Sequence, residues 1–418
     1  MKFVQSLLLL FVVIVSIVSS TSIIESVKAI DPRLYDLILS QLGGSNPDLN
    51  RNITQLIEAR GYPVEQHVAV TPDGYILSIQ RIPAGRYQPN PNPNRSNGKP
   101  AVLLQHGVED IGVSWVNQEN VYQSLGFILA DAGFDVWINN VRGTYLSNTN
   151  IYYTSDQVEY WQFSFDEMAE YDLPTAMNYV LRVTGNSKIS YVGHSQGTTM
   201  GFIGFANETL ASKIDLFVAL APVVRVTHCK STFLNLLAKY DVADLFVLLG
   251  DKSFLIQTPG MQKFLQIICT FDPSICQNSL ALIMGWDTAN INSTRLPVYM
   301  SHEPGGTSVQ NVLHWSQAVK TGYQKFDYGT KGNLAHYGQA TPPQYNISAF
   351  NAPVIIFYGS NDYLADPVDV QWLIPQLPTL LYNKYIQGYS HLDFVWGENA
   401  YLDVYQEVTQ YLLQYTSN

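Results

Sequence analysis

A serine stands between two glycines in the run Gly-His-Ser-Gln-Gly at residues 193–197. An apolar run precedes this pentapeptide, and a helix-forming run follows it over residues 196–206. In a sharp strand-to-helix turn the serine hydroxyl projects from the sheet, and the glycines leave room for the close approach of the two elements. This context favours Ser195 as a catalytic nucleophile. The competing interpretation is a helix-initiating turn in which Ser195 is only the N-cap.

A serine hydroxyl attacks a carbonyl effectively only when a base takes its proton. Where this turn is catalytic, an acid and then a histidine follow the serine in the chain. His391 lies in a short loop between a late predicted strand and the last predicted helix, which is where catalytic groups gather in open α/β sheets. The other histidines after Ser195 are interpreted as structural residues: His228, His302, His314 and His336.

The acid is expected directly after the predicted strand at residues 353–358, where Asp362 stands. Its role would be to hold the imidazole of His391 in one tautomer and to stabilise its cation. Asp366 and Asp369 are weaker candidates. Asp366 precedes a proline, as a helix N-cap does, and Asp369 would lie in the first turn of that helix.

Acyl transfer also needs hydrogen-bond donors for the developing oxyanion. One is expected to be the backbone N–H of Gln196, directly after the nucleophile. Residues 103–108 end an early predicted strand with a His-Gly turn, which makes the N–H of Val108 the second candidate; the alternative is a plain strand-end turn. Arg142, after the next strand, is expected to have a structural role, either bracing the neighbouring loops or capping carbonyl groups.

Strands and helices alternate around these residues. After a hairpin at residues 64–82, strands are predicted at residues 101–105, 134–138, 188–192, 214–220, 353–358 and 381–386, and helices at residues 121–132, 165–182, 196–206, 367–377 and 400–415. This rhythm indicates an α/β fold, with a mostly parallel sheet and helices on both faces.

The alternation stops between residues 225 and 346, where apolar helical runs such as residues 233–249 appear. We interpret this segment as a helical cap or lid inserted into one α/β domain. The run at 233–249 is either a buried cap helix or a lid whose apolar face opens on a lipid surface. The predicted division is a signal peptide at 1–22, a first core part at 23–224, the insertion at 225–346 and a second core part at 347–418.

An apolar run at residues 7–18, followed by small residues, is too short to span a bilayer and has the form of a secretory signal. The alternative is a membrane anchor, but no transmembrane anchor is expected. Asn-x-Ser/Thr sequons agree with passage through the secretory pathway, to the cell exterior or to lysosomes. Glycosylation is predicted at Asn52, Asn94, Asn207, Asn292 and Asn346.

Composition and cysteine usage narrow the class further. A formal net charge of −11, without a basic block, argues against a nucleic-acid binder. Cys269 and Cys276 are close enough to pair in a secreted chain, and Cys229 is expected to be a buried thiol. No Cys/His cluster has zinc-ligand spacing, so neither a metal nor another cofactor is expected.

Taken together, these residues resemble the acid lipase family over residues 52–411. The resemblance is carried by residues 57–63, 71–77, 104–107, 140–143, 193–198, 301–311, 314–319, 364–367 and 391–394. It implies an α/β-hydrolase fold with a cap domain, and hydrolysis of neutral lipid esters such as triacylglycerols or cholesteryl esters at acidic pH. By the family's pattern the nucleophile is Ser195, the acid Asp362 and the base His391. The same pattern implies oxyanion amides at Val108 and Gln196 and a disulfide between Cys269 and Cys276.

The expected partner is the surface of a neutral lipid droplet or micelle. Three alternatives stay open at this stage. One is a carboxylesterase or thioesterase that acts on soluble esters, and another is a serine peptidase on the same fold. The third is a non-catalytic lipid-binding protein, which a covalent serine probe would fail to label.

Overall fold

The computed structural model of this chain describes residue 33 and residues 46–87, 98–240, 252–285 and 290–416. Three predictions fall wholly or partly outside the described residues. They are the signal peptide at 1–22, the sequon at Asn94 and the second half of the apolar run at 233–249.

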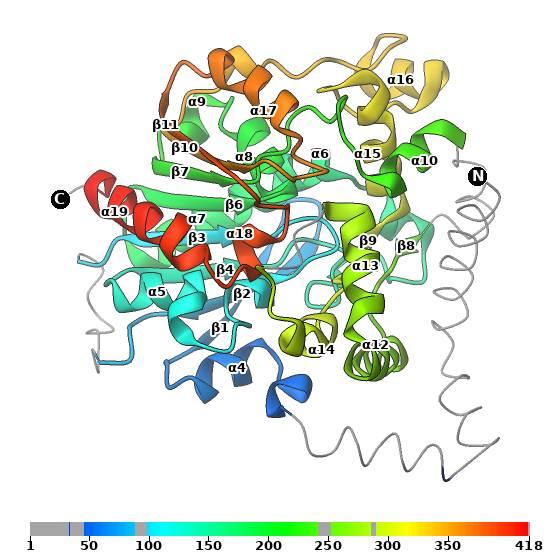
Figure 1. Cartoon of the computed structure of the whole chain (residues 1–418). Helices are drawn as coiled ribbons and strands as arrows, with labels where there is room; N and C mark the ends of the chain where they lie inside the picture. The colour runs from blue at the N-terminus through cyan, green and yellow to red at the C-terminus, as the bar shows by residue number, and fades with distance from the viewer. Residues whose placement is uncertain (1–32, 34–45, 88–97, 241–251, 286–289, 417–418) are drawn as a thin grey trace.

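Among the described residues, nine strands form one sheet through the centre of the molecule (Figure 1). They are β1 (Glu65–Val70), β2 (Tyr75–Ile82), β3 (Ala101–Gln105), β4 (Asp135–Asn139), β5 (Thr149–Asn150), β6 (Ile189–His194), β7 (Ile214–Leu220), β10 (Val354–Gly359) and β11 (Leu380–Ile386). The order is β1-β2-β4-β3-β6-β7-β10-β11, with β5 paired to β2. β2 is antiparallel to β1, β4 and β5, and the strands from β4 to β11 are parallel, which confirms the predicted α/β fold.

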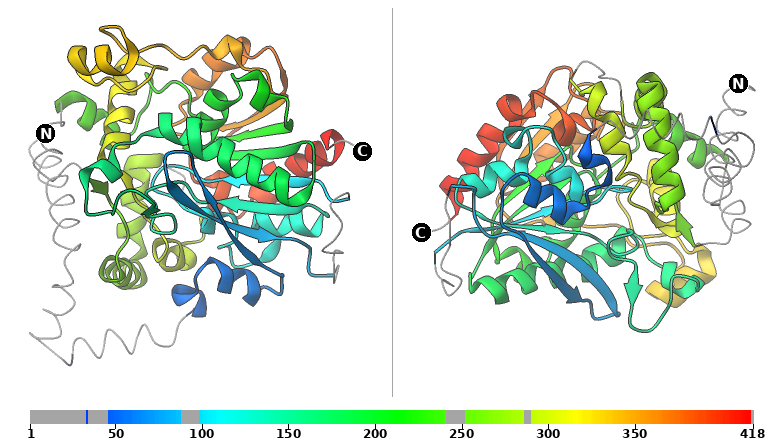
Figure 2. Two further views of the ribbon diagram at one scale, coloured as in Figure 1. Left: turned by 180° about the vertical axis from the view of Figure 1, so that it is seen from behind. Right: turned by 90° about the horizontal axis from the view of Figure 1, so that it is seen from below.

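Helices cover both faces of this sheet (Figures 1 and 2). Those outside the chain between β7 and β10 are α4 (Ile53–Ala59), α5 (Leu125–Asp131), α6 (Phe165–Glu167), α7 (Leu173–Thr184), α8 (Gln196–Gly204), α9 (Glu208–Ala211), α17 (Pro367–Leu373), α18 (Asp393–Trp396) and α19 (Gln406–Tyr415). Helices α5 and α19 lie in front of the sheet in Figure 1, and α7 lies behind it. Strands β3, β4 and β6 are buried along their whole length, as expected for parallel strands covered on both faces.

The chain between β7 and β10 adds no described strand to the large sheet. Its described elements are α10 (Thr232–Tyr240), β8 (Ser253–Phe254), α12 (Pro259–Phe271), α13 (Pro273–Met284), α14 (Leu296–Met300), β9 (Thr307–Ser308), α15 (Val309–Thr321) and α16 (Gly329–Tyr337). They lie mainly on the right of Figure 1, and β8 pairs only with β9. The predicted break in the strand–helix alternation is therefore present in the fold.

Helices α12 and α13 meet at a sharp bend that a disulfide closes. The bond joins Cys269 to Cys276, the pairing that the resemblance implied, while Cys229 is free and buried. None of the described helices is by itself long and apolar enough to cross a membrane. The bent pair formed by Pro259–Thr270 and Pro273–Met284 meets those criteria only when both helices are taken together.

Two helices predicted as continuous are interrupted. The one predicted at 165–182 passes through a π-helical turn at Met168–Asp172 before α7 begins, and α7 carries Pro174, which has no N–H to donate to the preceding turn. The one predicted at 400–415 begins with a π-helical turn at Tyr401–Tyr405 before α19. Such wide turns often occur near functional sites.

A buried aspartate joins segments that are far apart in sequence. Asp48 pairs with Arg51, Arg60 and Arg295 at nitrogen–oxygen distances of 2.7, 2.5 and 2.6 Å. Arg295 also donates to the carbonyl oxygen of Asn117 from two nitrogens, at 2.7 and 2.9 Å. Burial alone would raise the pKa of Asp48, but the three arginines hold the pKa of its carboxyl well below the usual range. The cluster ties residues 48–60 to the turn that leads into α14.

We expect Asp48→Asn to lower the free energy of unfolding by about 3–5 kcal/mol near neutral pH, because it leaves the buried charge of Arg295 without its partner. A carboxylate with a depressed pKa contributes stability that is present above its ordinary pKa of about 4 and lost as pH falls through the folded pKa. The difference from wild type should therefore shrink progressively as pH falls below about 4. Urea unfolding at several pH values measures it. Arg51→Gln, which removes a half-exposed partner, is the milder control, and a loss below about 1 kcal/mol for Asp48→Asn would contradict the account.

Candidate active site

Ser195 occupies the turn between β6 and α8. Its backbone has φ 53° and ψ −124°, in a region that residues with side chains rarely adopt. Neighbouring glycines make the turn possible. A Cβ on Gly193 would lie 2.7 Å from the carbonyl carbon of Gly197, and a Cβ on Gly197 would lie 2.5 Å from the carbonyl oxygen of Gln105. The pentapeptide therefore forms the tight strand-to-helix turn that its pattern predicts.

His391 and Asp362 form a buried pair on the loops that follow β11 and β10. Nδ1 of His391 lies 2.8 and 3.0 Å from the two carboxylate oxygens of Asp362. Asp362 Oδ1 also accepts the backbone N–H groups of Leu364, at 2.9 Å, and Ala365, at 2.8 Å. These bonds orient the carboxylate toward the ring. A proton on Nδ1 of the neutral imidazole leaves Nε2 as its acceptor.

The loop of His391 is held beside the serine turn. Nε2 of His194, the residue before Ser195, donates to the carbonyl oxygen of His391 at 2.9 Å, and the two rings lie 5.0 Å apart. Burial, with His391 adding to it, lowers the pKa of His194 to about 4, so His194 stays neutral in this role. Nε2 of His391 is buried and has no hydrogen-bond partner in the described part of the chain. Catalytic hydrogen bonds often tighten only when substrate is bound, which is consistent with this free acceptor.

Two backbone N–H groups are available beside Ser195. Those of Val108 and Gln196 make no hydrogen bond to any described residue. The loop that carries Val108 lies against the serine, since a Cβ on Gly107 would sit 2.9 Å from Cβ and 3.3 Å from Oγ of Ser195. The two predicted amides thus come from the loop after β3 and from the start of α8, on segments that meet at Ser195.

Buried polar side chains fix the surrounding loops. Nδ1 of His106 donates to the carbonyl oxygen of the next residue at 2.8 Å, and its Nε2 accepts the N–H of Val141 at 3.2 Å. The guanidinium of Arg142 binds Asp172 at 2.7 Å and Asp73 at 2.9 Å. Arg142 therefore has the bracing role expected of it.

The alternative acids are engaged in other interactions. Asp366 accepts a backbone N–H in the first turn of α17 at 2.9 Å, as an N-cap does. Asp369 binds the guanidinium of Arg225 at 2.6 Å and Nδ1 of His228 at 2.8 Å. Asp366 is the N-cap of α17 and Asp369 lies in its first turn, which are the positions that the sequence predicted.

The other histidines of the insertion are also placed as structural residues. His314 is buried, accepting from Ser164 Oγ at 3.0 Å and donating to the carbonyl oxygen of Gln324 at 2.9 Å. Burial lowers the pKa of His314 to about 3 and that of His302 to about 4. His336 stacks on a tyrosine ring at a centroid distance of 3.9 Å.

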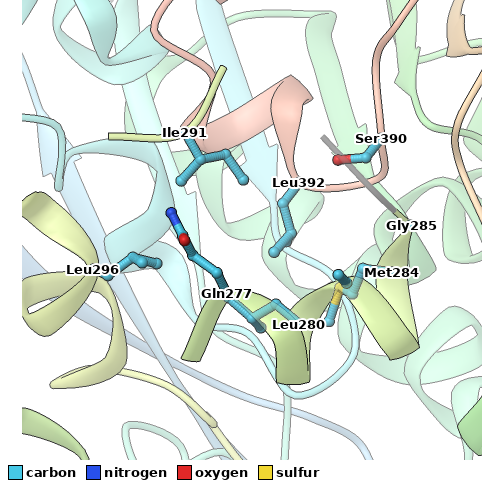
Figure 3. Close-up of a pocket in the computed structure, with 9 residues that line it drawn as sticks. Gln277, Leu280, Met284, Gly285, Ile291, Leu296, Ser390 and Leu392 are labelled. Carbon is cyan, nitrogen blue, oxygen red and sulfur yellow. The ribbon is translucent and has the colours of Figure 1, made fainter. Parts of the chain in front are cut away.

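A small apolar pocket, with a cavity volume of about 20 Å³, lies beside His391 (Figure 3). It is lined by Gln277, Leu280, Ala281, Met284, Gly285, Ile291, Leu296, Ser390 and Leu392. The residues on both sides of His391 thus face helices α13 and α14 across it. Sequence reasoning missed this pocket, because its walls come from segments about a hundred residues apart and carry no shared pattern.

The end of α13 contacts the loops of Asp362 and His391 directly. The carbonyl oxygen of Met284 accepts the N–H of His391 and that of Tyr363, each at 3.3 Å. Gly285 forms an isolated antiparallel β-bridge with Asp362. A Cβ at Gly285 would lie 2.0 Å from the carbonyl oxygen of Asn361. The end of α13 and the loops of Asp362 and His391 are therefore packed backbone to backbone.

The four described sequon asparagines share one local structure. The side-chain oxygen of each accepts a backbone N–H as an N-cap, which leaves the amide nitrogen, the atom that carries a glycan, outside the cap. They are Asn52, Asn207 and Asn346, which are exposed, and Asn292, which is half-buried.

Acidic side chains gather behind the loop of Val108. Burial raises the pKa of Glu109 and of Glu303 well above the usual value, and neighbouring Asp110 raises that of Glu303 further. Asp110 itself accepts the backbone N–H of Gly107 at 3.3 Å. The raised pKa values favour the uncharged form of both carboxyl groups, whereas their ionisation would place negative charges together near this loop.

We expect Glu303→Gln to change stability little at about pH 4.5 and to raise the free energy of unfolding at about pH 7. The raised folded pKa means that the native protein keeps a proton that the unfolded chain releases above about pH 4.3. Wild type therefore loses stability as pH rises from there to the folded pKa, by about 1.4 kcal/mol per pH unit, and the amide does not. Urea unfolding at both pH values, with exposed Glu208→Gln as control, tests this. An equal effect of Glu303→Gln at the two pH values would contradict it.

Comparison with known proteins agrees with this geometry. A family model described as "alpha/beta hydrolase fold" matches residues 100–398, and one described as "Partial alpha/beta-hydrolase lipase region" matches residues 53–119. The gastric triacylglycerol lipase of Bos taurus is 46% identical over 375 residues, covering 88% of this chain and 93% of that protein. The lysosomal acid lipase/cholesteryl ester hydrolase of Homo sapiens is 42% identical over 383 residues, covering 90% and 94%.

Solved structures show the same fold at much lower identity. A soluble variant of monoglyceride lipase from Saccharomyces cerevisiae has a TM-score of 0.50 and 16% identity, covering 85% of this chain and 99% of that chain. From the family match and the identity to full-length relatives, this chain belongs to the α/β-hydrolases and, among them, to the acid lipase family.

Proposed function

We propose that this protein is a lipase that hydrolyses neutral lipid esters, such as triacylglycerols or cholesteryl esters, with Ser195, Asp362 and His391 as its catalytic triad. The observation that carries the proposal is the buried His391–Asp362 pair, whose unpartnered Nε2 lies on the loop held beside the strained serine turn. The names of the relatives, gastric triacylglycerol lipase and lysosomal acid lipase/cholesteryl ester hydrolase, support this substrate class.

In the proposed reaction, Oγ of Ser195 attacks the ester carbonyl carbon while Nε2 of His391 takes the hydroxyl proton. Asp362 holds the Nδ1–H and stabilises the imidazolium. The oxyanion accepts hydrogen bonds from the N–H groups of Val108 and Gln196. His391 then gives the proton to the leaving alcohol, and water activated by the same imidazole hydrolyses the acyl-enzyme.

Residues 225–346 act in this proposal as a cap between core parts 23–224 and 347–418. Two observations support that role. The end of α13 contacts the loops of Asp362 and His391, and an apolar pocket separates α13 from the residues beside His391. The pocket is too small to hold a hydrocarbon chain, but its apolar lining excludes water beside His391, so the cap would shield the acyl-enzyme from solvent.

The proposed setting is the surface of a lipid droplet or micelle at acidic pH. The buried acids Glu109 and Glu303 support the pH range, since they favour the protonated protein around the loop of Val108. The disulfide, the exposed sequons and the relatives agree with a secretory-pathway protein that is secreted or lysosomal. We propose glycosylation at the five sequon asparagines.

Ser195→Ala should lower kcat on an emulsified long-chain triacylglycerol by about three to six orders of magnitude, because the proposed acyl-enzyme forms on Oγ of Ser195. Released fatty acid is titrated from about pH 4 to 8, beside a soluble short-chain ester. Ser212→Ala, which changes an exposed serine on the same domain, is the matched control. A Ser195→Ala protein within tenfold of wild type would contradict the assignment, and cleavage of only the soluble ester would indicate an esterase.

Asp362→Asn should lower kcat by about 10⁴-fold, while the protein keeps its fold, because an amide favours the wrong tautomer of His391. Asp366→Asn and Asp369→Asn are the comparison variants, since those carboxylates bind elsewhere. We expect both to retain turnover within about tenfold of wild type per folded molecule. If either variant lost more kcat than Asp362→Asn, that residue and not Asp362 would be assigned as the acid of the triad.

A further inference from the structure

The side chain of Gln196 is held by the insertion, although only its backbone N–H serves the proposed reaction. Its carboxamide oxygen Oε1 accepts two hydrogen bonds, from Nδ2 of Asn311 and from Nε1 of Trp315, each at 2.8 Å. Its Nε2 lies 3.3 Å from Sδ of Met168, in the π-helical turn. Gln196, Asn311 and Trp315 are all buried. Helix α15 therefore fixes the orientation of the first residue of α8.

Asn311 is itself held in one orientation. Its Oδ1 accepts the backbone N–H of Phe165 at 2.9 Å, and its Nδ2 also contacts Oγ1 of Thr307 at 3.0 Å. Its backbone N–H donates to Oγ of Ser308 at 2.9 Å. A flipped carboxamide would turn its NH₂ toward the N–H of Phe165 and its oxygen toward Oε1 of Gln196, so only the observed orientation satisfies both neighbours.

The residues just before α15 hold the loop that carries the other proposed oxyanion amide, the N–H of Val108. The N–H of Gly305 donates to the carbonyl oxygen of Glu109 at 2.6 Å, and the carbonyl oxygen of Gly305 accepts the N–H of Tyr145 at 3.0 Å. Glu109 directly follows Val108 and has φ 57°. A Cβ on Gly305 would lie 2.6 Å from the carbonyl oxygen of Asp110. This close backbone contact fixes the turn that presents the N–H of Val108.

We propose that residues 305–315 form a brace that sets the spacing of the two oxyanion amides, and that Asn311 is the positioning residue for Gln196. The inference rests on the proposed acyl-transfer function. Oxyanion donors stabilise the transition state only within about 2.7–3.1 Å of the oxyanion, so an error of half an ångström in either amide lowers the rate. The brace gives a function to the stretches 301–311 and 314–319, which matched the acid lipase pattern without an assigned role.

A structural role alone predicts different behaviour. If Asn311 only stabilised the fold, its loss would reduce the amount of folded protein and leave the turnover of each folded molecule unchanged. A positioning role predicts loss of kcat with KM retained, and strong coupling between the two residues.

The experiment is a double-mutant cycle of Asn311→Ala and Gln196→Ala, which keeps the backbone N–H at residue 196. Turnover of p-nitrophenyl butyrate is measured at about pH 5 per folded molecule, with the folded fraction taken from near-ultraviolet circular dichroism. We expect each single variant to lower kcat about 10–100-fold with KM changed less than about twofold, part of the about 10²–10³-fold that a lost oxyanion donor costs. The kcat of the double variant should be no lower than that of the more impaired single variant.

Gln317→Ala is the matched control on α15. Gln317 also makes two hydrogen bonds, at 2.9 and 2.8 Å, but both go to the backbone of Asp327, so kcat should stay within about twofold of wild type. If Asn311→Ala folds poorly, Trp315→Phe removes one donor to Oε1 and keeps an aromatic ring; it should lower kcat about 3–30-fold.

Retention of kcat within twofold in Asn311→Ala, or in Trp315→Phe where that variant replaces it, would overturn the brace. Single losses that multiply in the double variant would overturn it as well. A wild-type protein without esterase activity would instead contradict the proposed function. An active wild type with independent losses contradicts the brace and leaves the proposed function standing.

Discussion

The backbone conformation of Ser195 is the constraint on which the rest of the site depends. With φ at 53°, the residue is held by a turn that only glycines at 193 and 197 permit, between a buried strand and a buried helix. Such strain persists only when the surroundings over-determine it. Strand β6 supplies this rigidity, because it lies between β3 and β7 in the middle of the parallel sheet. Because the position of the Ser195 hydroxyl is fixed, the loops that carry Val108, Asp362 and His391 must place their groups around it.

The loops after the parallel strands bring those groups. The loop after β3 carries Val108, and the loops after β10 and β11 carry Asp362 and His391. Contacts from the insertion then hold all three loops, through Met284 at the loops of Asp362 and His391 and through Gly305 at the loop of Val108. In this account the insertion does more than cover the lipid. It forms part of the framework that keeps the reacting groups in register.

Much of this arrangement is predictable from the sequence because the signals are local. The glycines around Ser195, the strand–helix rhythm and the order serine, aspartate, histidine are all readable along the chain, and they specify the fold and the proposed triad. The interruption of helices by π-helical turns is less visible, because the turns depend on what the helix packs against as well as on Pro174.

The remaining features depend on contacts across the chain. The bond from Asn311 to Gln196 spans 115 residues, and the pair between Arg295 and Asp48 spans 247. No periodicity or spacing connects such residues, since only the completed fold brings them together. Sequence resemblance drew attention to the stretch that contains Asn311, but it assigned no contact to it.

The central claim, that Ser195 is the activated nucleophile, is tested most directly by covalent labelling of the folded protein with a fluorophosphonate, followed by peptide mass spectrometry. The account predicts about one label per molecule, on the peptide that contains Ser195, and nearly complete loss of labelling in His391→Ala, because the hydroxyl then lacks its base. Labelling of another residue, no labelling of wild type, or equal labelling in His391→Ala would contradict it.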